Sequence, residues 1–585
     1  MRMWVRLLQV LVISVMIIPL ASPAVAQEEE MLREETAIFD VDGSNPITNF
    51  QLFNPYVIGV PLNHGAHQAM WEPLFLLNWV TGELDMWLAE SVEANDALDV
   101  WTVKIREGVK WADGEDFNAD DLVFTLNMLK DNAPELWDSA TFAEWVDSVE
   151  KIDDLTVQIN LTKPNPRFAM DYLGVKIWRE FHVLPEHVWK DQDPLTFTFY
   201  DPEKGWPFAT GAYLPVDIGE DEMVWKRRDD WWGAQTGFRE LPKPKWLIWR
   251  VHTTEEIRVA AAAVDELDVL TDITFGAFQA LIAQNPNWKG FTDTNPAWHP
   301  DPCPRLITIN NTVAPWDDPE MRWALSYLVD RAEVVTIAYE GTTIPSRAIL
   351  VEYPRLSAIN DKLEAKGLTA NIYDPEKAAV IFESKGYAKN ADGYWEKDGE
   401  VLSITVDSHD GFIELRRMAQ IVVEQWQRGG VDARQRVLAG STWGDNIAFG
   451  NFEAVSDWHA CASITEPWAT MNIDTQKYLM PVGERASGNT MRWSGPNAEA
   501  YSTLVDEMGV LPLGDPKIEE LALEAMEYWF KDLPFLPITQ SRKIVPANYT
   551  YWVNWPTIDN HYTYPCTWCA NGILIVHNIQ PASGE

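Results

Sequence analysis

The stretch "WTVKIREGVKWADGEDFNADDLVFTLNMLK", residues 101–130, changes from one hydrophobic periodicity to another around two glycines. Trp101, Val103 and Ile105 alternate with polar residues, which predicts a half-buried β-strand. Asn118 is suited to cap a helix, because its side chain can accept hydrogen bonds from the free N–H groups of the first turn. Leucines then recur on one helical face, so the stretch predicts a strand, a turn and a capped helix.

Five acidic side chains in this stretch could instead mark an active site: Asp113, Glu115, Asp116, Asp120 and Asp121. Asp113-Gly114 is a typical turn pair, because glycine adopts positive φ without steric cost. Acidic residues at a helix start interact favourably with the positive end of the helix dipole. No nearby histidine, lysine or second carboxylate pair is placed to share protons with them. We therefore interpret these acids as scaffold.

Length and charge narrow the possible functions. A chain of 585 residues is expected to form two or three domains, because a single core stops growing near about 250–300 residues. Hydrophobic residues make up 46% of it, enough to fill such cores. The formal net charge of -42 repels nucleic acids and anionic membrane surfaces, so we expect no nucleic-acid partner.

The N-terminus has the pattern of a secretory signal peptide. Arg2 and Arg6 precede an apolar run at residues 7–20, and Ala24-x-Ala26 provides the small residues of a cleavage site. The apolar run is short for a membrane anchor, and no cysteine lies nearby to carry a lipid. We expect residues 1–26 to be removed and the mature chain to be exported, soluble, and periplasmic or extracellular.

Export changes how the four cysteines are interpreted. In an oxidising compartment Cys303, Cys461, Cys566 and Cys569 are expected to form structural disulfides, with three possible pairings. The "CTWC" spacing at 566–569 also occurs in redox and zinc sites. No second pair with this spacing exists, and no βαβ pattern flanks it, so we do not expect such a site.

The stretch that opens this section also resembles a family signature. "REGVKWADGEDFNADDLVFTL" is similar to "W-x-L-x-G-V-K-W-x-D-G-x-x-F-x-A-x-D-V" of the extracellular solute-binding proteins of oligopeptide- and dipeptide-type ABC importers, solute-binding protein family 5. Other similar segments follow in the family's order, at residues 206–218, 306–341, 373–387 and 489–508. The resemblance covers nearly the whole mature chain.

The resemblance implies an α/β fold of the periplasmic-binding-protein-like type II class, in which two lobes close over a ligand cleft. Lobe I would comprise residues 35–300, with an extra subdomain near 75–200. Lobe II would comprise residues 305–535, and residues 536–585 would return to lobe I. Helices are expected after Asp318-Pro319 and Asp374-Pro375, because proline in the first turn lacks only a donor that has no partner there.

The same resemblance places the ligand region in "AVSDWHACASITEPWATMNIDT", residues 454–475. Peptide-binding relatives hold the peptide's free ammonium with an aspartate here. In this sequence Ser463 or Cys461, depending on the alignment, stands at that position, and Asp457 could substitute from another angle. Some relatives bridge the site cysteine to the crossing strand. This implies a Cys303–Cys461 bridge and leaves Cys566 and Cys569 to pair with each other or to remain unpaired.

The missing aspartate bears on the ligand, because a buried ammonium without a partner costs several kcal/mol. A neutral oligosaccharide needs no such anchor, and some relatives stack sugar rings on tryptophans. This chain has 30 Trp, although most tryptophans serve to fill cores. We therefore favour an oligosaccharide slightly over an oligopeptide. The candidate ligand-binding residues are Trp458, Asp457, His459, Ser463, Glu466, Trp443, Asn446 and Trp71.

No catalytic motif accompanies these residues. The sequence has no G-x-S-x-G turn, no P-loop and no H-E-x-x-H spacing. His64 and His67 could share a helical face, but two histidines alone make a poor metal site, so we expect neither metal nor cofactor. We predict a monomeric, non-enzymatic receptor that delivers its ligand to the membrane permease of an ABC importer. The alternative from another class is a secreted glycan-degrading enzyme.

Overall fold

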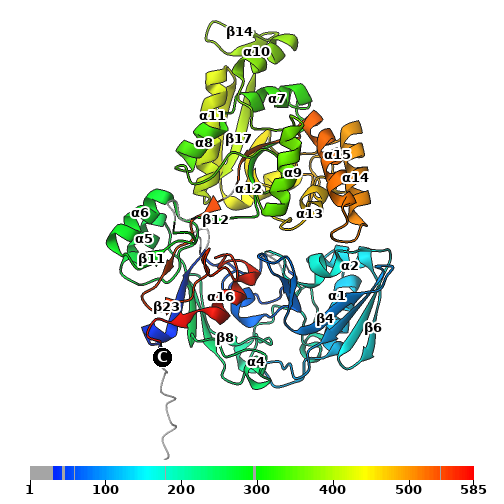
Figure 1. Ribbon diagram of the computed structural model, residues 1–585, viewed down its shortest axis with the longest axis vertical. Helices are drawn as coiled ribbons and strands as arrows, with labels where there is room; N and C mark the ends of the chain where they lie inside the picture. The colour runs from blue at the N-terminus through cyan, green and yellow to red at the C-terminus, as the bar shows by residue number, and fades with distance from the viewer. Residues whose placement is uncertain are drawn as a thin grey trace, which may run out of the picture.

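The computed structural model describes residues 30–41, 46–57, 59–177, 180–293, 298–540 and 542–584. The expected signal peptide, residues 1–26, lies outside these ranges. The chain folds into two lobes, which Figure 1 shows as an upper and a lower group of elements joined near β12 (His299–Pro300). We call the lower group lobe I and the upper group lobe II. Within the described ranges, none of the helices is long and apolar enough to cross a bilayer.

Lobe I has a four-stranded sheet at its centre. Its strand order is β1 (Thr36–Asp40), β10 (Trp246–Arg250), β9 (Glu222–Arg227) and β8 (Tyr213–Ile218). Only the pairing of β1 with β10 is parallel; the other pairs in this sheet are antiparallel. Large aromatic side chains fill the core beside it, as when Phe39 stacks on Trp249 with ring centroids 4.6 Å apart.

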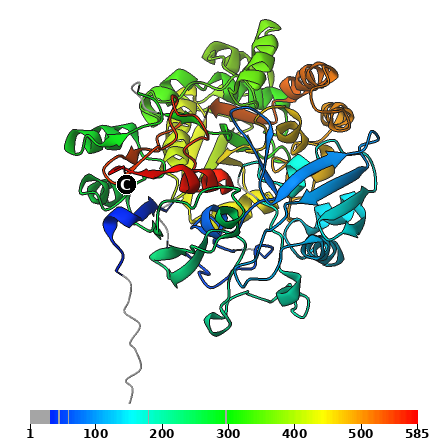
Figure 2. The same ribbon diagram turned by 60° about the horizontal axis from the view of Figure 1, so that its bottom comes forward.

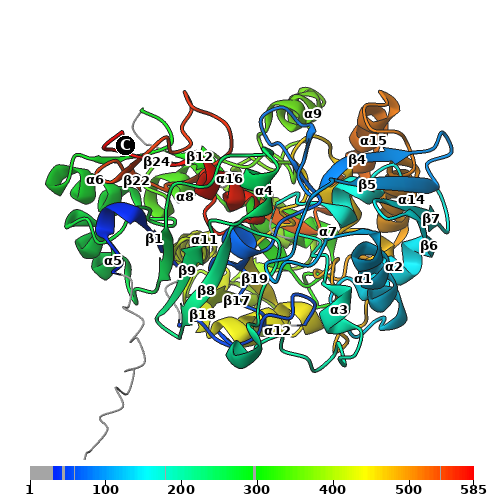
Figure 3. The same cartoon turned by 90° about the horizontal axis from the view of Figure 1, so that it is seen from below.

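Lobe I contains a second four-stranded sheet. It consists of β4 (Ala89–Ala94), β5 (Val100–Ile105), β7 (Thr156–Leu161) and β6 (Val146–Asp153), all antiparallel. The helices α1 (Ala119–Asp131) and α2 (Ser139–Trp145) pack on it, and Figure 3 shows them beside β6 and β7.

The stretch 101–130 forms β5 and α1, as its periodicity predicts. Asn118 caps α1 by accepting a hydrogen bond from the N–H of Asp120, and the carboxylate of Asp121 accepts one from the N–H of Asn118 in return. Asp121 is buried and also accepts a hydrogen bond from the indole of Trp111 at 3.1 Å. Burial raises the pKa of Asp121 to about 6. The buried acid of this stretch therefore holds the turn and the helix together.

Lobe II contains a five-stranded sheet in the order β18 (Asp432–Leu438), β17 (Ser403–His409), β19 (Ala454–Trp458), β13 (Arg305–Ile309) and β20 (Phe535–Thr539). The first three strands run parallel, and β13 is antiparallel to both of its neighbours. The helices of this lobe are α7 (Pro319–Tyr327), α8 (Arg331–Ala338), α9 (Pro354–Ala365), α10 (Pro375–Ser384), α11 (Ile413–Gly429), α12 (Gly440–Phe449), α13 (Trp468–Asn472), α14 (Pro496–Gly509) and α15 (Lys517–Asp532).

Both helices expected after Asp-Pro pairs are present. Asp318 accepts a hydrogen bond from the N–H of Glu320 at the start of α7, and Asp374 accepts one from the N–H of Lys377 at the start of α10. Gly386 follows α10 with a φ of +88°, a conformation that costs glycine little and that commonly ends a helix.

The chain crosses between the lobes twice. The outward crossing contains β11 (Trp288–Lys289) and β12, which pair with β22 (Ala547–Asn548) and β21 (Arg542–Lys543) of the returning chain. The returning chain follows β20, which ends at Thr539. Beyond it α16 (Ile573–Asn578) packs on η3 (Ala66–Met70), a short π-helix of lobe I. Figure 2 shows the red C-terminal helix beside the blue N-terminal part of lobe I.

The four cysteines form two disulfide bonds, with the pairing that the family resemblance implies. Cys303, in the outward crossing, is bonded to Cys461, three residues beyond the end of β19. Cys566 is bonded to Cys569. The first bridge spans 158 residues of sequence and the second only 3, so they constrain the unfolded chain to very different degrees.

We predict that replacing both Cys303 and Cys461 by serine lowers the free energy of unfolding by about 2–5 kcal/mol, because the long loop regains its entropy. The matched control replaces Cys566 and Cys569 and is expected to cost less, because its loop is short. Urea unfolding measures both, and peptide mapping without reductant identifies the pairs. Recovery of Cys303 linked to any cysteine other than Cys461 contradicts the assignment.

Candidate ligand-binding cleft

A cavity of about 490 Å³ lies between the lobes. Lobe I contributes Tyr56, His64, His67, Trp137, Glu180 and His182; lobe II contributes Arg305, Phe412, Glu414 and Trp458; and the crossings contribute Asp301, Cys303 and Lys543. A second cavity of about 200 Å³ shares Tyr56, Asp138 and Glu180 with it and extends to Tyr172 and Cys461. The cleft is therefore elongated, and both lobes line it.

Aromatic side chains form much of the lobe II wall. Trp458 is the last residue of β19 and is half-buried. The centroid of its ring lies 5.1 Å from that of Phe412 and 5.4 Å from that of Trp443, so two aromatic rings pack against the indole. On the lobe I side Trp137 lines the same cavity and is 43% exposed. The cleft thus has a lining tryptophan from each lobe.

A network of buried charges forms the part of the cleft where the crossings meet. Arg305 lies at the start of β13. Its Nη2 is 3.2 Å from Oδ2 of Asp301 and 2.5 Å from Oε1 of Glu414. Lys543 lies on the returning strand β21. Its Nζ is 2.5 Å from Oδ2 of Asp272 and 3.6 Å from Oε1 of Glu414. Burial alone would lower the pKa of Arg305, but Glu414 and Asp301 outweigh it and raise that pKa. The lining charges of this region are therefore largely neutralised within the protein.

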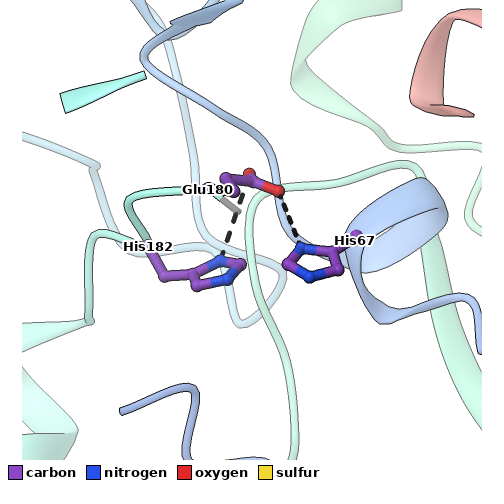
Figure 4. Close-up of side chains that lie close together, drawn as sticks. All are labelled: His67, Glu180 and His182. Atoms are coloured by element: carbon purple, nitrogen blue, oxygen red, sulfur yellow. Dashed lines mark hydrogen bonds and ion pairs between the residues drawn. The ribbon is translucent and has the colours of Figure 1, made fainter. Parts of the chain in front are cut away.

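Two histidines and a glutamate meet on the lobe I wall. Nδ1 of His67 lies 3.3 Å from Oε2 of Glu180, and Nδ1 of His182 lies 4.0 Å from Oε1 of the same carboxyl group (Figure 4). The imidazole rings stack with centroids 5.2 Å apart. Burial, with the carboxylate of Glu72 as a second cause, raises the pKa of Glu180 well above its usual range.

Of the eight candidate ligand-binding residues, the structure places only Trp458 in the lining of this cavity. Trp443 is buried behind Trp458, where its indole donates to the carbonyl of Ser456. Asn446 donates to the carboxylate of Asp407 at 3.1 Å. Trp71 is buried in lobe I and contacts the ring of His182. Trp443 and Trp71 therefore pack behind residues that line the cavity, and Asn446 binds Asp407 away from the lining.

The residues that follow Trp458 bind one another instead of facing the cavity. His459 lies beyond the end of β19, and its Nε2 is 2.9 Å from the carboxylate of Asp474. Ser463 and Thr470 exchange two hydrogen bonds, each from a backbone N–H to the partner's hydroxyl. Local partners therefore bind polar atoms of His459 and Ser463, and both residues lie outside the lining of this cavity, so their direct contact with a ligand stays a prediction.

Asp457 is buried one residue before Trp458, and alternation along the strand directs the two side chains to opposite faces. Its Oδ1 accepts a hydrogen bond from the N–H of Trp458 at 2.7 Å. Burial raises the pKa of Asp457 to about 7, against the effect of that hydrogen bond. Asp457 is thus a poorly solvated carboxyl group outside the cavity lining.

Glu466 joins the lobes at one end of the cleft. Its Oε2 pairs with Nη2 of Arg167 at 3.2 Å. Nη1 of Arg167 also donates to the carbonyls of Gly509 and Leu511 at 2.8 and 3.2 Å. Arg167 follows β7 of lobe I, whereas its three partners belong to lobe II, so its fully buried side chain connects the two lobes.

Several cavity residues were not anticipated because they come together only in the folded chain. Asp301 and Arg305 share one segment, whereas Glu414 and Lys543 come from two others more than 100 residues away. His67 and Glu180 are 113 residues apart. The short "LNHGAHQAMW" segment, with two histidines three residues apart, was the one local signal, and both of its histidines do line the cavity.

The chain belongs to the bacterial extracellular solute-binding proteins, family 5, whose profile, described as the family's middle part, matches residues 83–481. It is similar to the glutathione-binding protein GsiB of Escherichia coli (strain K12), with 27% identity over 389 residues, 66% of this chain and 67% of that relative.

Two solved structures share the fold. One is a mannohexaose-bound periplasmic oligopeptide-binding protein of an oligopeptide ABC transporter from Thermotoga maritima, with 24% identity, a TM-score of 0.80, and coverage of 94% of this chain and 99% of that one. The other is the oligopeptide-binding protein AppA from Bacillus subtilis in complex with a nonapeptide, with 17% identity, a TM-score of 0.69, and coverage of 91% and 98%.

We predict that Asp457→Asn stabilises the protein at pH 8 by about 2–4 kcal/mol and has little effect at pH 4. The folded protein keeps its proton on Asp457 up to a pKa of about 7, whereas the unfolded chain releases it near 3.8. Stability is therefore lost as the pH rises between these values, and asparagine, which stays neutral, avoids that loss.

Urea unfolding at both pH values measures the difference. Asp445→Asn, at an exposed position on α12, is the matched control and is expected to change stability little at either pH. An equal effect of Asp457→Asn at pH 4 and pH 8 contradicts the role given to burial.

Proposed function

We propose that this protein is the substrate-binding receptor of an ABC importer and that its ligand is a neutral oligosaccharide, with an oligopeptide as the second candidate. Membership in family 5 and a cleft lined by both lobes support the receptor role. The observation that carries the proposal is the position of Trp458, which is held by Phe412 and Trp443 in the wall of that cleft.

Two features favour the sugar. Sugar rings stack on aromatic faces, and tryptophans line the cleft on both lobes. The carboxylates of Asp301 and Glu414 are both paired with Arg305, so they are poorly suited to anchor the ammonium group of a peptide. The relative with a bound mannohexaose supports the same class of ligand, whereas relatives that bind glutathione and a nonapeptide support the peptide.

Transport would proceed by closure of the lobes. A ligand that contacts both walls favours the closed form by the extra contacts it makes there. The closed receptor would then dock on the membrane permease, and ATP hydrolysis would take place on a separate subunit. The role requires export, for which the pattern at residues 1–26 provides a signal.

We expect mannohexaose to raise the melting temperature of the purified protein, because a ligand that binds only the folded state stabilises it. Trp458→Ala should weaken binding at least about tenfold, since a buried aromatic face contributes roughly 2 kcal/mol. Trp323→Ala is the matched control: Trp323 is half-buried on α7, outside the cavity lining, and its loss should leave binding unchanged.

The same screen includes a peptide pool and glycans incubated long enough to reveal hydrolysis. A shift with peptides only, together with normal binding by Trp458→Ala, overturns the sugar assignment and keeps the receptor. Turnover of a glycan that a single carboxylate substitution abolishes overturns the receptor in favour of a secreted enzyme.

The bridge made by Arg167 gives an independent test of lobe closure. We predict that Arg167→Ala increases the radius of gyration of the free protein and weakens ligand binding about tenfold, because affinity falls with the population of the closed form. Lys163→Ala is the control, since Lys163 pairs with Glu144 within the same lobe. Small-angle scattering and calorimetry measure the two effects, and unchanged values for Arg167→Ala contradict a closure contact.

A further inference from the structure

The cluster of His67, Glu180 and His182 has the composition and placement of a metal site. One potential ligand atom from each side chain lies within 4.8 Å of the others. All three residues are buried, yet all three line the main cavity. In the part of the chain that the structure describes, Oε1 of Glu180 accepts no hydrogen bond. The buried carboxyl group of Glu180 thus lies beside two imidazoles at the cavity wall, with Oε2 nearer to His67 and Oε1 nearer to His182.

The backbone fixes the three side chains from two sides. His67 lies on η3, a single π-helical turn, and such turns are frequent at functional sites. Glu180 and His182 are two residues apart on a segment outside the regular helices and strands. The hydroxyl of Tyr56 donates to the carbonyl of His182 and accepts a hydrogen bond from its N–H. The cluster is therefore held by elements that do not depend on a ligand.

The distances are close to those a metal ion needs. With bonds of about 2.0–2.2 Å, two ligand atoms of a tetrahedral site lie about 3.4 Å apart. The His67–Glu180 pair already has this spacing at 3.3 Å, whereas the His182–Glu180 pair lies at 4.0 Å and the three ligand atoms lie within 4.8 Å of one another. Binding an ion therefore requires the side chains to rotate, and the two stacked imidazole rings must turn out of their near-parallel arrangement. Two imidazoles with one carboxylate suit zinc and its neighbours in the first transition series, whereas Ca²⁺ and Mg²⁺ prefer oxygen ligands throughout.

We propose that His67, Glu180 and His182 bind one divalent transition-metal ion of the zinc class in the wall of the ligand cleft. Three protein ligands leave at least one coordination position, and the cavity in front of the cluster places it where water or an oxygen atom of the transported ligand can bind. This inference goes beyond the receptor role and does not depend on the class of ligand transported.

His64 provides an internal control for this assignment. It lines the same cavity and lies three residues from His67, so sequence spacing alone would pair these two histidines. In the structure Nδ1 of His64 instead lies 3.4 Å from the carbonyl of Pro61, and His64 is not part of the cluster. A site built on the cluster must tolerate loss of His64, whereas a site built on the sequence pair cannot.

Calorimetric titration of untagged, chelator-treated protein with Zn²⁺ tests the proposal. Millimolar Mg²⁺ in the buffer occupies the many surface carboxylates of this acidic chain. We expect one tight site per chain. His67→Ala, His182→Ala and Glu180→Gln should each weaken it about 100-fold, since even the partners of metal ligands contribute about 10- to 100-fold. His64→Ala should bind Zn²⁺ like the unmodified protein.

Co²⁺ provides a spectroscopic test of metal binding. A cluster that serves only to hold the fold together would bind no Co²⁺ and give no signal. Co²⁺ bound to the cluster should give visible absorption bands that disappear in His182→Ala and persist in His64→Ala. Circular dichroism establishes that the variants are folded. The proposal is overturned if Zn²⁺ does not bind, if the cluster variants bind it as well as the unmodified protein, or if loss of His64 abolishes binding.

Discussion

The arrangement of the lobes depends on the ion pairs that the buried guanidinium of Arg305 makes with Asp301 and Glu414. A buried charge is costly unless it is paired, and Arg305 is paired with a crossing residue, Asp301, and with Glu414 at the start of α11. Lys543 extends the network to Asp272 of lobe I. Both crossings and both lobes therefore meet in one set of charges, and any motion of the lobes has to keep that set paired.

Much of the architecture could be predicted because it is written locally in the sequence. The alternation from Trp101 to Ile105 and the cap at Asn118 were sufficient to predict β5 and α1. Aspartate followed by proline was sufficient to place the starts of α7 and α10. These signals involve hydrogen bonds and backbone preferences within a few residues, and tertiary packing does not change their outcome.

The cleft could not be predicted to the same degree, because its lining is defined by distant segments and by strand alternation. Trp458 was predicted in the ligand region and lines the cavity, whereas Asp457 points away because neighbouring side chains in a strand face opposite sides. Beyond the strand, His459 is paired with Asp474, a partner that no spacing rule identifies. Residues that lie close together in the predicted ligand region therefore differ in whether they line the cavity.

The disulfides also bear on how the protein is made. Counted from the N-terminus, the first cysteine is bonded to the second and the third to the fourth. On an N-terminus-first route across a membrane, each cysteine therefore meets its partner as the next one to emerge. A simple thiol oxidase acting during translocation is enough to produce this pattern, so maturation of the receptor needs no enzyme that reshuffles wrong bonds.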